Sequence, residues 1–374
     1  MSRWFLDSAS TTQPYKEVVD VVADVMYNHY GNPSSTHEMG QDAKNIIENV
    51  RNQIAEDINC ETHEIIFTSG SCEANSLAFT AVTYDFKVIT TRMEHKSIET
   101  LKVPKMYVSN DWNGNIDLNS LKERIVLADF GQCRAFVSIC AANSEIGVVQ
   151  DIKAISNIVH EYNGVLHVDA TQLYPEERID VKALGIDLMS VSAQKFHGPR
   201  GIGFLYCKDG IKLKPLIGGS QEDGRRGGTY NTPAIAGMGK ALEINRGVLH
   251  DYTNVGTKFN RDELATRILE IPGVHLNGPE LGANRLFNNI SVRIDGVKAS
   301  DIVTLASMYG IYISAGSACS SGEAVPSSTL KAIGLTDEQA LSTIRITVNE
   351  TLNQHDISAI AKILKGLIEQ LRES

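Results

Sequence analysis

Between residues 64 and 207 the chain repeats one rhythm, in which a short apolar run is followed by an amphipathic segment or a polar loop. Short apolar runs bounded by turn residues indicate buried strands. The rhythm predicts an α/β fold with a mainly parallel sheet covered on both faces. The predicted strands are 64–68, 87–91, 106–109, 134–140, 164–168, 186–192 and 201–207, and the predicted helices here and before them are 16–29, 40–57, 73–80 and 152–162.

A charged residue lies at or just beyond the carboxyl end of two of these predicted strands. Asp169 follows the run 164–168, and Lys195 follows the run 186–192. Open α/β sheets bind ligands at this edge. An acid and a lysine placed there fit a site for pyridoxal phosphate, in which the lysine holds the cofactor as a Schiff base and the acid keeps its ring nitrogen protonated. Such an acid is also common as a helix cap, and a lysine before a Gly-Pro turn is also common as a solvated residue, so the pair alone leaves both interpretations open.

The order of the elements changes in the last third of the chain. A helical stretch from Asn231 to about Asn260 is long enough to pass from one domain to another. Chains of this length usually contain more than one domain. We expect a large domain of residues 15–255 and a small domain of residues 1–14 and 256–374. The elements predicted in the small domain are helices near 257–270, 299–309 and 355–371 and strands near 288–293, 312 and 343–347.

Small residues, Ser69-Gly70-Ser71-Cys72, join the predicted strand 64–68 to the helix that follows it. At such a junction free backbone N–H groups converge on an anion, helped by the helix dipole. The junction is therefore a candidate phosphate site. It lacks the Gly-Lys-Ser/Thr ending of the nucleotide-binding P-loop.

A second unusual segment, of about residues 314–326, contains Cys319. Every residue from Ser314 to Gly322 is small, which suits a mobile loop. A lone cysteine is most often buried, but Cys319 has no apolar neighbours, which favours an exposed and reactive thiol. The six cysteines lack C-x-x-C pairs, so we expect free thiols and no metal site. Arg345, inside the strand-like run 343–347, either reaches the surface or binds a carboxylate as a fork.

The net charge of −10 argues against a general affinity for nucleic acid or for anionic membranes. Hydrophobic residues make up 42% and charged residues 21% of the chain, as in an ordinary water-soluble protein. No apolar run approaches the length of a membrane span, and the N-terminal residues do not resemble a secretory signal. We expect a cytoplasmic protein with no membrane partner and no direct nucleic-acid partner.

In this combination of motifs the chain resembles the cysteine desulfurases, pyridoxal phosphate enzymes of the class V aminotransferase type, over nearly its whole length. The resemblance implies the aspartate aminotransferase-like fold, with a seven-stranded sheet in the large domain, a smaller α+β domain and a homodimer that shares its active sites. The loop around Cys319 resembles that of the long-loop group. The matching residues are Leu6-Asp7, Thr11-Thr12, Gly31-Asn32-Pro33-Ser34, Phe67-Thr68-Ser69-Gly70, Glu73, Asn75, Glu94-His95, Glu145-Ile146-Gly147, His167-Val168-Asp169-Ala170, Gln172, Ser192, Lys195, Gly198-Pro199, Arg226, Gly228-Thr229, Ser317-Ala318-Cys319 and Ile344-Arg345.

The resemblance also implies a role for each candidate residue. Lys195 would bind the cofactor and move the substrate's α-proton, His95 would stack on the cofactor ring and assist proton transfer, and Cys319 would take sulfur from L-cysteine as a persulfide. Asp169 would pair with the ring nitrogen and Gln172 with the phenolic oxygen. The other implied cofactor contacts are Ser71, Cys72, Ser144, Ser192, Gln194 and Thr229 of the partner subunit, and the implied substrate contacts are Arg345, Asn32 and Asn143.

The chain departs from the family pattern at three of these positions. Gln194 replaces a histidine beside the lysine, Ser144 replaces an asparagine, and Cys72 replaces a threonine at the phosphate. The chain also stops soon after its last helix, whereas members that feed the iron–sulfur scaffold tend to carry a longer tail. These departures favour a dedicated acceptor protein.

Three sulfur acceptors are open: the machinery of DNA phosphorothioation, which the departures favour, a tRNA-thiolating enzyme, and an iron–sulfur assembly scaffold. Two alternative functions also remain open. One is a selenocysteine lyase or another class V aminotransferase. The other is a non-catalytic relative that binds a partner.

Overall fold

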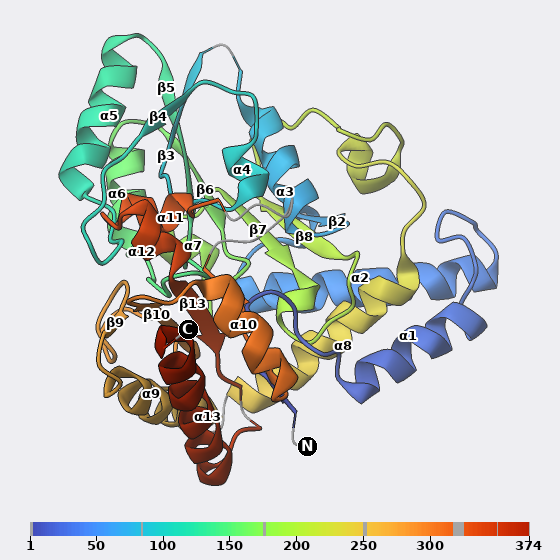
Figure 1. Ribbon diagram of the computed structural model, residues 1–374. Helices are drawn as coiled ribbons and strands as arrows, with labels where there is room; N and C mark the ends of the chain where they lie inside the picture. The colour runs from blue at the N-terminus through green and yellow to red at the C-terminus, as the bar shows by residue number, and fades with distance from the viewer. Residues whose placement is uncertain are drawn as a thin grey trace.

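The computed structural model describes residues 3–83, 85–174, 177–249, 253–316, 325–349 and 351–373. Its largest element is a seven-stranded sheet in the order β2-β8-β7-β6-β5-β3-β4 (Figure 1). The strands from β7 to β4 are parallel, whereas β8 is antiparallel to both of its neighbours. The predicted mainly parallel sheet is confirmed. Its strands are β2 (Ile65–Thr68), β3 (Phe86–Thr90), β4 (Lys105–Tyr107), β5 (Arg134–Cys140), β6 (Val165–Asp169), β7 (Leu188–Ser192) and β8 (Gly203–Cys207).

Helices cover both faces of this sheet because its central strands are apolar on both sides. Every residue of β2, β6, β7 and β8 is buried. Ile65 and Phe67 of β2 belong to one core, and Ile66 between them belongs to the core on the opposite face. The helices around the sheet are α1 (Lys16–Asn28), α2 (Glu38–Ile58), α3 (Ser71–Ala78), α4 (Lys96–Glu99), α5 (Leu118–Phe130), α6 (Ile152–Glu161), α7 (Val181–Leu184) and α8 (Thr232–Leu249).

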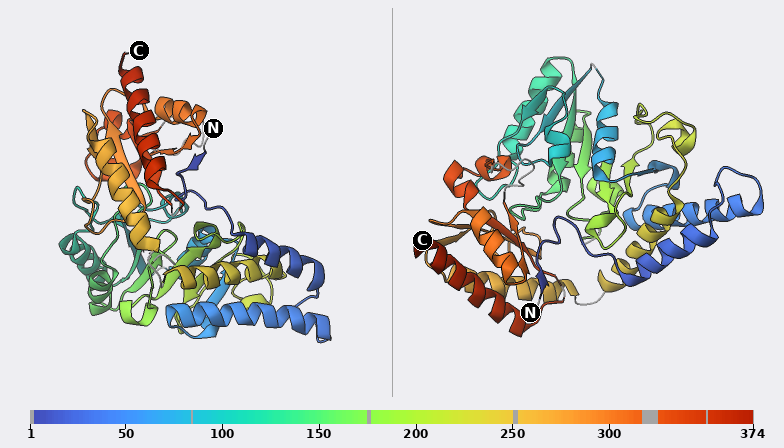
Figure 2. Two further views of the ribbon diagram at one scale, coloured as in Figure 1. Left: turned by 90° about the horizontal axis from the view of Figure 1, so that it is seen from below. Right: turned by 45° about the vertical axis from the view of Figure 1, so that its right-hand side comes forward.

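A smaller antiparallel sheet, in the order β12-β13-β10-β9, has its own apolar core. The N-terminal strand β1 (Trp4–Phe5) pairs with β11 (Ile311–Tyr312), and Leu6 is fully buried in this second core. Both views in Figure 2 accordingly place the N-terminus beside the C-terminal third of the chain. The remaining elements are β9 (Val274–Leu276), β10 (Asn289–Ile294), β12 (Ser314–Ala315), β13 (Thr343–Thr347), α9 (Thr253–Leu269), α10 (Ala299–Met308), α11 (Ser328–Ala332), α12 (Asp337–Leu341) and α13 (Gln354–Glu373).

The structure differs from the sequence-based expectation in several helices. The single helical stretch expected from Asn231 to about Asn260 is two helices, α8 and α9, and residues 250–252 between them lie outside the described residues. Helix α5 was not predicted, because exposed apolar residues such as Leu127 and Phe130 blur its period. The short helices α11 and α12 were not predicted either. The domain boundaries stay predictions.

No helix in the described part of the chain is both long and apolar enough to span a membrane.

Candidate active site

A cavity of about 620 Å3 lies between the two sheets. One wall is formed by the segments that follow β5, β6 and β7, and the other by β12, β13 and the residues around the start of α11. The cavity is therefore at the carboxyl edge of the parallel strands, where ligands of such sheets bind. The candidate residues that line it are Ser71, Cys72, His95, Asn143, Ser144, Asp169, Gln172, Gln194, Lys195 and Arg345.

Lys195 lies in the 3-10 turn η3 (Ala193–Lys195) directly after β7. Its ammonium group donates to the backbone oxygens of Ala9 and Ser10, each at 2.7 Å. Burial, together with the nearby Arg345 guanidinium, lowers the pKa of Lys195 to about 8. A larger share of this lysine is therefore neutral, and thus nucleophilic, near pH 8 than of an exposed lysine.

Asp169 is the last residue of β6, and both of its carboxyl oxygens accept a hydrogen bond. Oδ2 accepts from the side-chain amide of Asn75 at 2.7 Å, and Oδ1 accepts from the backbone N–H of Thr171 at 3.1 Å. A carboxylate offers about four acceptor positions. Asp169 consequently keeps capacity for a further donor, such as a protonated ring nitrogen.

His95 caps the N-terminus of α4 and lines the same cavity. Its Nδ1 lies 2.8 Å from the Ser97 hydroxyl and accepts from the Ser97 backbone N–H at 3.2 Å. These contacts fix the ring through one nitrogen.

The segment predicted to bind the phosphate lies at the N-terminus of α3. Ser71 and Cys72 line the cavity, and no side chain caps the helix, so its first N–H groups remain available to a ligand. Gly70 precedes them at φ +145°, where a Cβ would lie 3.3 Å from the Ser192 hydroxyl oxygen. The backbone conformation at this position therefore favours glycine, and the Ser192 oxygen leaves little room for a side chain.

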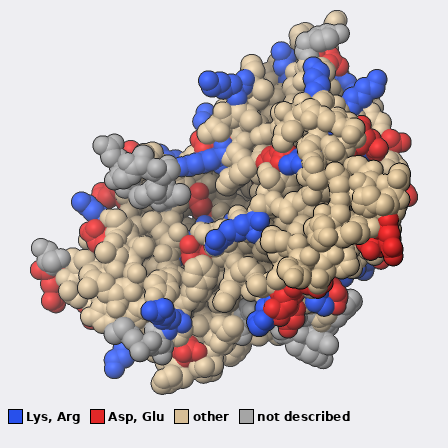
Figure 3. Space-filling model, turned by 90° about the vertical axis from the view of Figure 1, so that its right-hand side faces the viewer, with Lys and Arg blue, Asp and Glu red and all other residues tan. Residues whose placement is uncertain are grey.

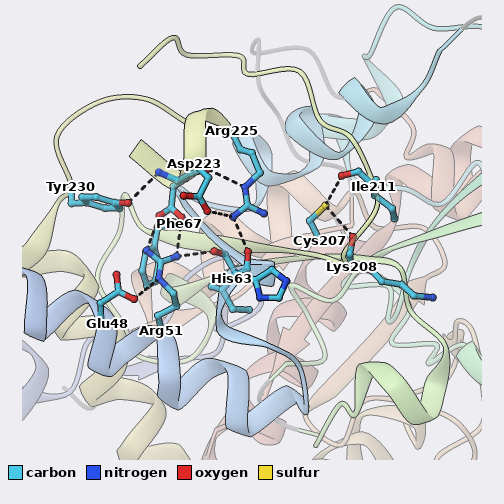
Figure 4. A network of polar contacts seen from close by, with 12 residues as sticks. Glu48, Arg51, His63, Phe67, Cys207, Lys208, Ile211, Asp223, Arg225 and Tyr230 are labelled. Atoms are coloured by element: carbon cyan, nitrogen blue, oxygen red, sulfur yellow. Dashed lines mark hydrogen bonds and ion pairs between the residues drawn. The ribbon is translucent and has the colours of Figure 1, made fainter. Parts of the chain in front are cut away.

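The glycine-rich loop between β8 and α8 is anchored through Glu222, which forms a buried ion pair with a residue of α2 and a hydrogen bond with β2. Arg51 donates to Glu222 at 2.8 Å, and Glu222 also accepts from the backbone N–H of Phe67. Figure 4 shows this network, in which the Tyr230 hydroxyl accepts from the Glu222 backbone. The anchor leaves Thr229, near the end of the loop, exposed at the surface and away from the cavity of its own chain.

Arg345, on β13, reaches the cavity from the second sheet. Its Nη2 atom donates to Asp7 Oδ1 at 2.6 Å and to Ser10 Oγ at 2.7 Å, whereas its Nε atom is buried without a hydrogen-bond partner among the described residues. The guanidinium is therefore held on one side and keeps an unused donor. This arrangement favours the carboxylate-binding interpretation over a side chain that extends into solvent.

Cys319 lies outside the described residues. The segment 317–324 that contains it is flanked by residues that line the cavity, Ser314, Ala315 and Gly316 on one side and Val325 to Thr329 on the other. Ser314 is paired with Arg345 in the second sheet. The chain therefore enters and leaves this segment at the cavity.

Two candidates, Asn32 and Ser192, do not line the cavity. Thr229, whose predicted role is in the partner subunit, does not line the cavity of its own chain either. Asn143 lines it, but its side chain is occupied by the protein. Its amide donates to the Met93 backbone oxygen and to Thr329, and its carbonyl oxygen accepts from the N–H groups of residues 145 and 146. The role of Asn143 in substrate binding gains no support from these contacts.

For two acidic residues of the cavity, Glu94 and Glu145, the sequence predicted no role. Burial raises the pKa of Glu94 to about 8, although the Thr91 hydroxyl donates to it at 2.6 Å. Burial also raises the pKa of Glu145 to about 7, and Glu145 accepts a hydrogen bond from Ser327 at the start of α11. The sequence offered one signal for both, since each stands beside a polar candidate just after a predicted strand.

The residues present fit pyridoxal phosphate. Lys195 supplies an amine of lowered pKa, Asp169 an acceptor with spare capacity, and the uncapped start of α3 a set of N–H donors. The Thr171 hydroxyl is buried at the cavity and has no partner among the described residues, which leaves a further polar group for a ligand. Among those residues no group of three or more His, Cys, Asp or Glu is placed to hold a metal ion.

Comparison with known proteins gives consistent matches over the whole chain. The aminotransferase class-V family matches residues 4–360. The chain is 36% identical to cysteine desulfurase IscS of Dictyoglomus turgidum over 383 residues, which covers 98% of the chain and 95% of that protein. It is also 36% identical to cysteine desulfurase IscS 1 of Archaeoglobus fulgidus over 387 residues, which covers 98% of the chain and 97% of the relative.

Solved structures agree with this result. The X-ray structure of a NifS-like protein from Rickettsia africae has a TM-score of 0.88 and 29% identity, and the match covers 100% of both chains. The structure of SspA in complex with cysteine has a TM-score of 0.78 and 30% identity, and the match covers 93% of this chain and 99% of that one.

Proposed function

The chain belongs to the aminotransferase class-V family and is a pyridoxal phosphate-dependent cysteine desulfurase, and from this premise we propose that it passes sulfur as a persulfide on Cys319 to an acceptor protein. The observation that carries the proposal is the arrangement around one cavity of Lys195 and Asp169 from the first sheet and Arg345 from the second. The net reaction converts L-cysteine and the Cys319 thiol into L-alanine and a Cys319 persulfide, which balances in atoms and electrons.

In this proposal some residues of the cavity bind the cofactor and another binds the substrate. Lys195, Asp169, Gln172 and the start of α3 hold the cofactor. Bound pyridoxal phosphate supplies an electron-withdrawing ring that weakens bonds at the α- and β-carbons of an amino acid. Arg345 binds the substrate carboxylate through the donors that Asp7 and Ser10 leave free.

Proton transfer falls to Lys195 and His95. The lowered pKa of Lys195, about 8, suits a group that takes up and returns a proton near neutral pH. His95 faces the same cavity and assists this transfer. The Cys319 thiolate forms the new S–S bond to the substrate sulfur as the Cβ–S bond breaks, and alanine leaves after protonation of its β-carbon.

We further propose a homodimer, in which Thr229 of the partner subunit contacts the phosphate. The exposed position of Thr229 on its anchored loop supports this assignment. The acceptor would be a protein rather than a nucleic acid, since the net charge is −10 and basic and acidic side chains are interspersed on the face in Figure 3. DNA phosphorothioation, tRNA thiolation and iron–sulfur assembly are the pathways that such an acceptor could serve.

Mass spectrometry after incubation with L-cysteine tests the proposal. We expect one added sulfur atom on Cys319, one alanine for each sulfur transferred, and neither product from Cys319→Ala or Lys195→Ala. Sulfide release from Cys319→Ala at the wild-type rate would refute the persulfide and favour a selenocysteine lyase or another class V enzyme. Affinity capture from the native host with Cys319 persulfidated would identify the acceptor.

A further inference from the structure

Asn75 and Ser97 are hydrogen-bonded to two of the predicted cofactor contacts, Asp169 and His95. The family resemblance implies no role for either residue. Asn75, on α3, is fully buried. Its amide Nδ2 donates to Asp169 Oδ2 at 2.7 Å and to the Ser97 hydroxyl oxygen at 2.9 Å. That hydroxyl lies 2.8 Å from Nδ1 of His95. The four side chains form one continuous path of hydrogen bonds between the two predicted cofactor contacts.

The chemistry of the groups fixes the direction of every bond on this path. Asp169 as a carboxylate only accepts, so the Asn75 side chain must turn its NH2 group toward it. The second hydrogen of this NH2 group goes to the Ser97 hydroxyl oxygen. The single hydrogen of the hydroxyl is then free for His95 Nδ1, and the Ser97 backbone N–H points at the same atom from 3.2 Å. Nδ1 therefore accepts from two donors and carries no proton.

We propose that Asn75 and Ser97 are positioning residues that hold His95 in the tautomer with its proton on Nε2. A neutral imidazole has one nitrogen that donates and one that accepts, so filling Nδ1 with donors leaves Nε2–H as the donor of the ring. His95 then exchanges protons at the cavity through Nε2 alone. At the other end of these hydrogen bonds, the Asn75 amide fixes the position of Asp169 Oδ2. That His95 and Asp169 contact the cofactor rests on the proposed function. The tautomer of His95, in contrast, is inferred from its hydrogen bonds alone.

Nitrogen NMR of the histidine rings tests the tautomer directly. The full-length protein is labelled with 15N-histidine and measured with and without added pyridoxal phosphate, and His95→Gln assigns the His95 signals among the 10 histidines. The test variants are Ser97→Ala and Asn75→Ala, and Ser97→Thr is the conservative variant that keeps a hydroxyl. Thr100→Ala is the matched control, since it removes a hydroxyl that donates to the Lys96 backbone beside the same short helix.

We expect the wild type, Ser97→Thr and Thr100→Ala to show His95 with its proton on Nε2. Ser97→Ala should show a share of the Nδ1–H form, and its kcat/KM for L-cysteine should fall about threefold to tenfold, the effect of one lost hydrogen bond. A wild-type spectrum with the proton on Nδ1, or spectra unchanged in both Ser97→Ala and Asn75→Ala, would overturn the proposal. The spectrum requires no turnover, so an inactive protein would contradict the proposed function without deciding the tautomer.

Discussion

Glu94 is a buried acid whose substitution by glutamine should change how the stability of the protein depends on pH. The residue is 6% exposed, and its Oε1 accepts from the Thr91 hydroxyl at 2.6 Å. Its Oε2 is buried without a hydrogen-bond partner among the described residues. Burial, opposed by the Thr91 hydrogen bond and assisted by the negative charge of Asp169, raises the pKa of Glu94 from 4.5 to about 8. The folded protein thus keeps this carboxyl neutral at pH 7.

The sign of the effect follows from where the proton is bound. Between the pKa of the unfolded chain, 4.5, and that of the folded protein, about 8, the folded state retains a proton that the unfolded state has released. The free energy of unfolding therefore falls as pH rises through this window. From about pH 6 to about pH 8.5 the loss attributable to Glu94 is about 2 to 3 kcal/mol. The glutamine of Glu94→Gln has nearly the shape of the neutral acid, and its side chain does not ionise in this pH range.

Urea denaturation of the cofactor-free protein at the two pH values measures the effect. The unfolding free energy of Glu94→Gln minus that of the wild type should increase by about 2 to 3 kcal/mol at the higher pH. Glu99→Gln is the control, because Glu99 is exposed on the neighbouring helix α4 and its difference should stay constant. If the Glu94→Gln difference is also the same at both pH values, the carboxyl is not held neutral by burial, and the reasoning fails.

Further predictions concern Lys195 and Arg345, two of the cationic residues that line the cavity. Lys195→Ala should abolish the visible absorption band of the cofactor and the formation of alanine, because it removes the amine at the cavity. Arg345→Lys should raise KM for L-cysteine about 10- to 100-fold in steady-state assays and lower kcat less, since it loses charged hydrogen bonds to the substrate carboxylate. The rate at which the cofactor-free protein binds pyridoxal phosphate, followed by stopped-flow absorbance, should rise with pH around a midpoint near 8, where Lys195 loses its proton. Arg345→Leu should move this midpoint upward, because the guanidinium lowers the pKa of Lys195, and an unmoved midpoint would contradict that cause.

Local sequence patterns were sufficient for most of the large sheet. Strands β5 and β13 have the predicted bounds, β6 ends at Asp169, and β7 ends shortly before Lys195. These strands are buried on both faces, so their apolar runs are continuous and easily recognised. The patterns could not give the direction of β8, because a buried strand has the same composition in a parallel and in an antiparallel pair.

The candidate site was predictable only where a residue follows a buried strand or stands out from its surroundings. Asp169, Lys195 and Arg345 satisfy this condition, and the structure brings all three to one cavity. Ser97 does not, because a serine on a helix is a common surface residue, and Asn75 matched the family pattern without an implied role. Their contacts depend on how α3 and α4 approach β6, which is a property of the tertiary structure. Thr229 and Cys319 stay predictions, the first because it would act in another subunit and the second because it lies outside the described residues.

The N-terminal segment explains how residues so far apart in the sequence share one cavity. Asp7 binds Arg345 of the second sheet at 2.6 Å, and two residues later the Ala9 backbone oxygen accepts from both Lys195, at 2.7 Å, and Gln172, at 3.0 Å. Leu6, beside Asp7, is fully buried in the second core. A shift of this segment would therefore move the Arg345 guanidinium and the Lys195 side chain relative to each other. Because catalysis requires substrate and cofactor in one fixed geometry, the residues before α1 belong to the active site as much as those on the strands.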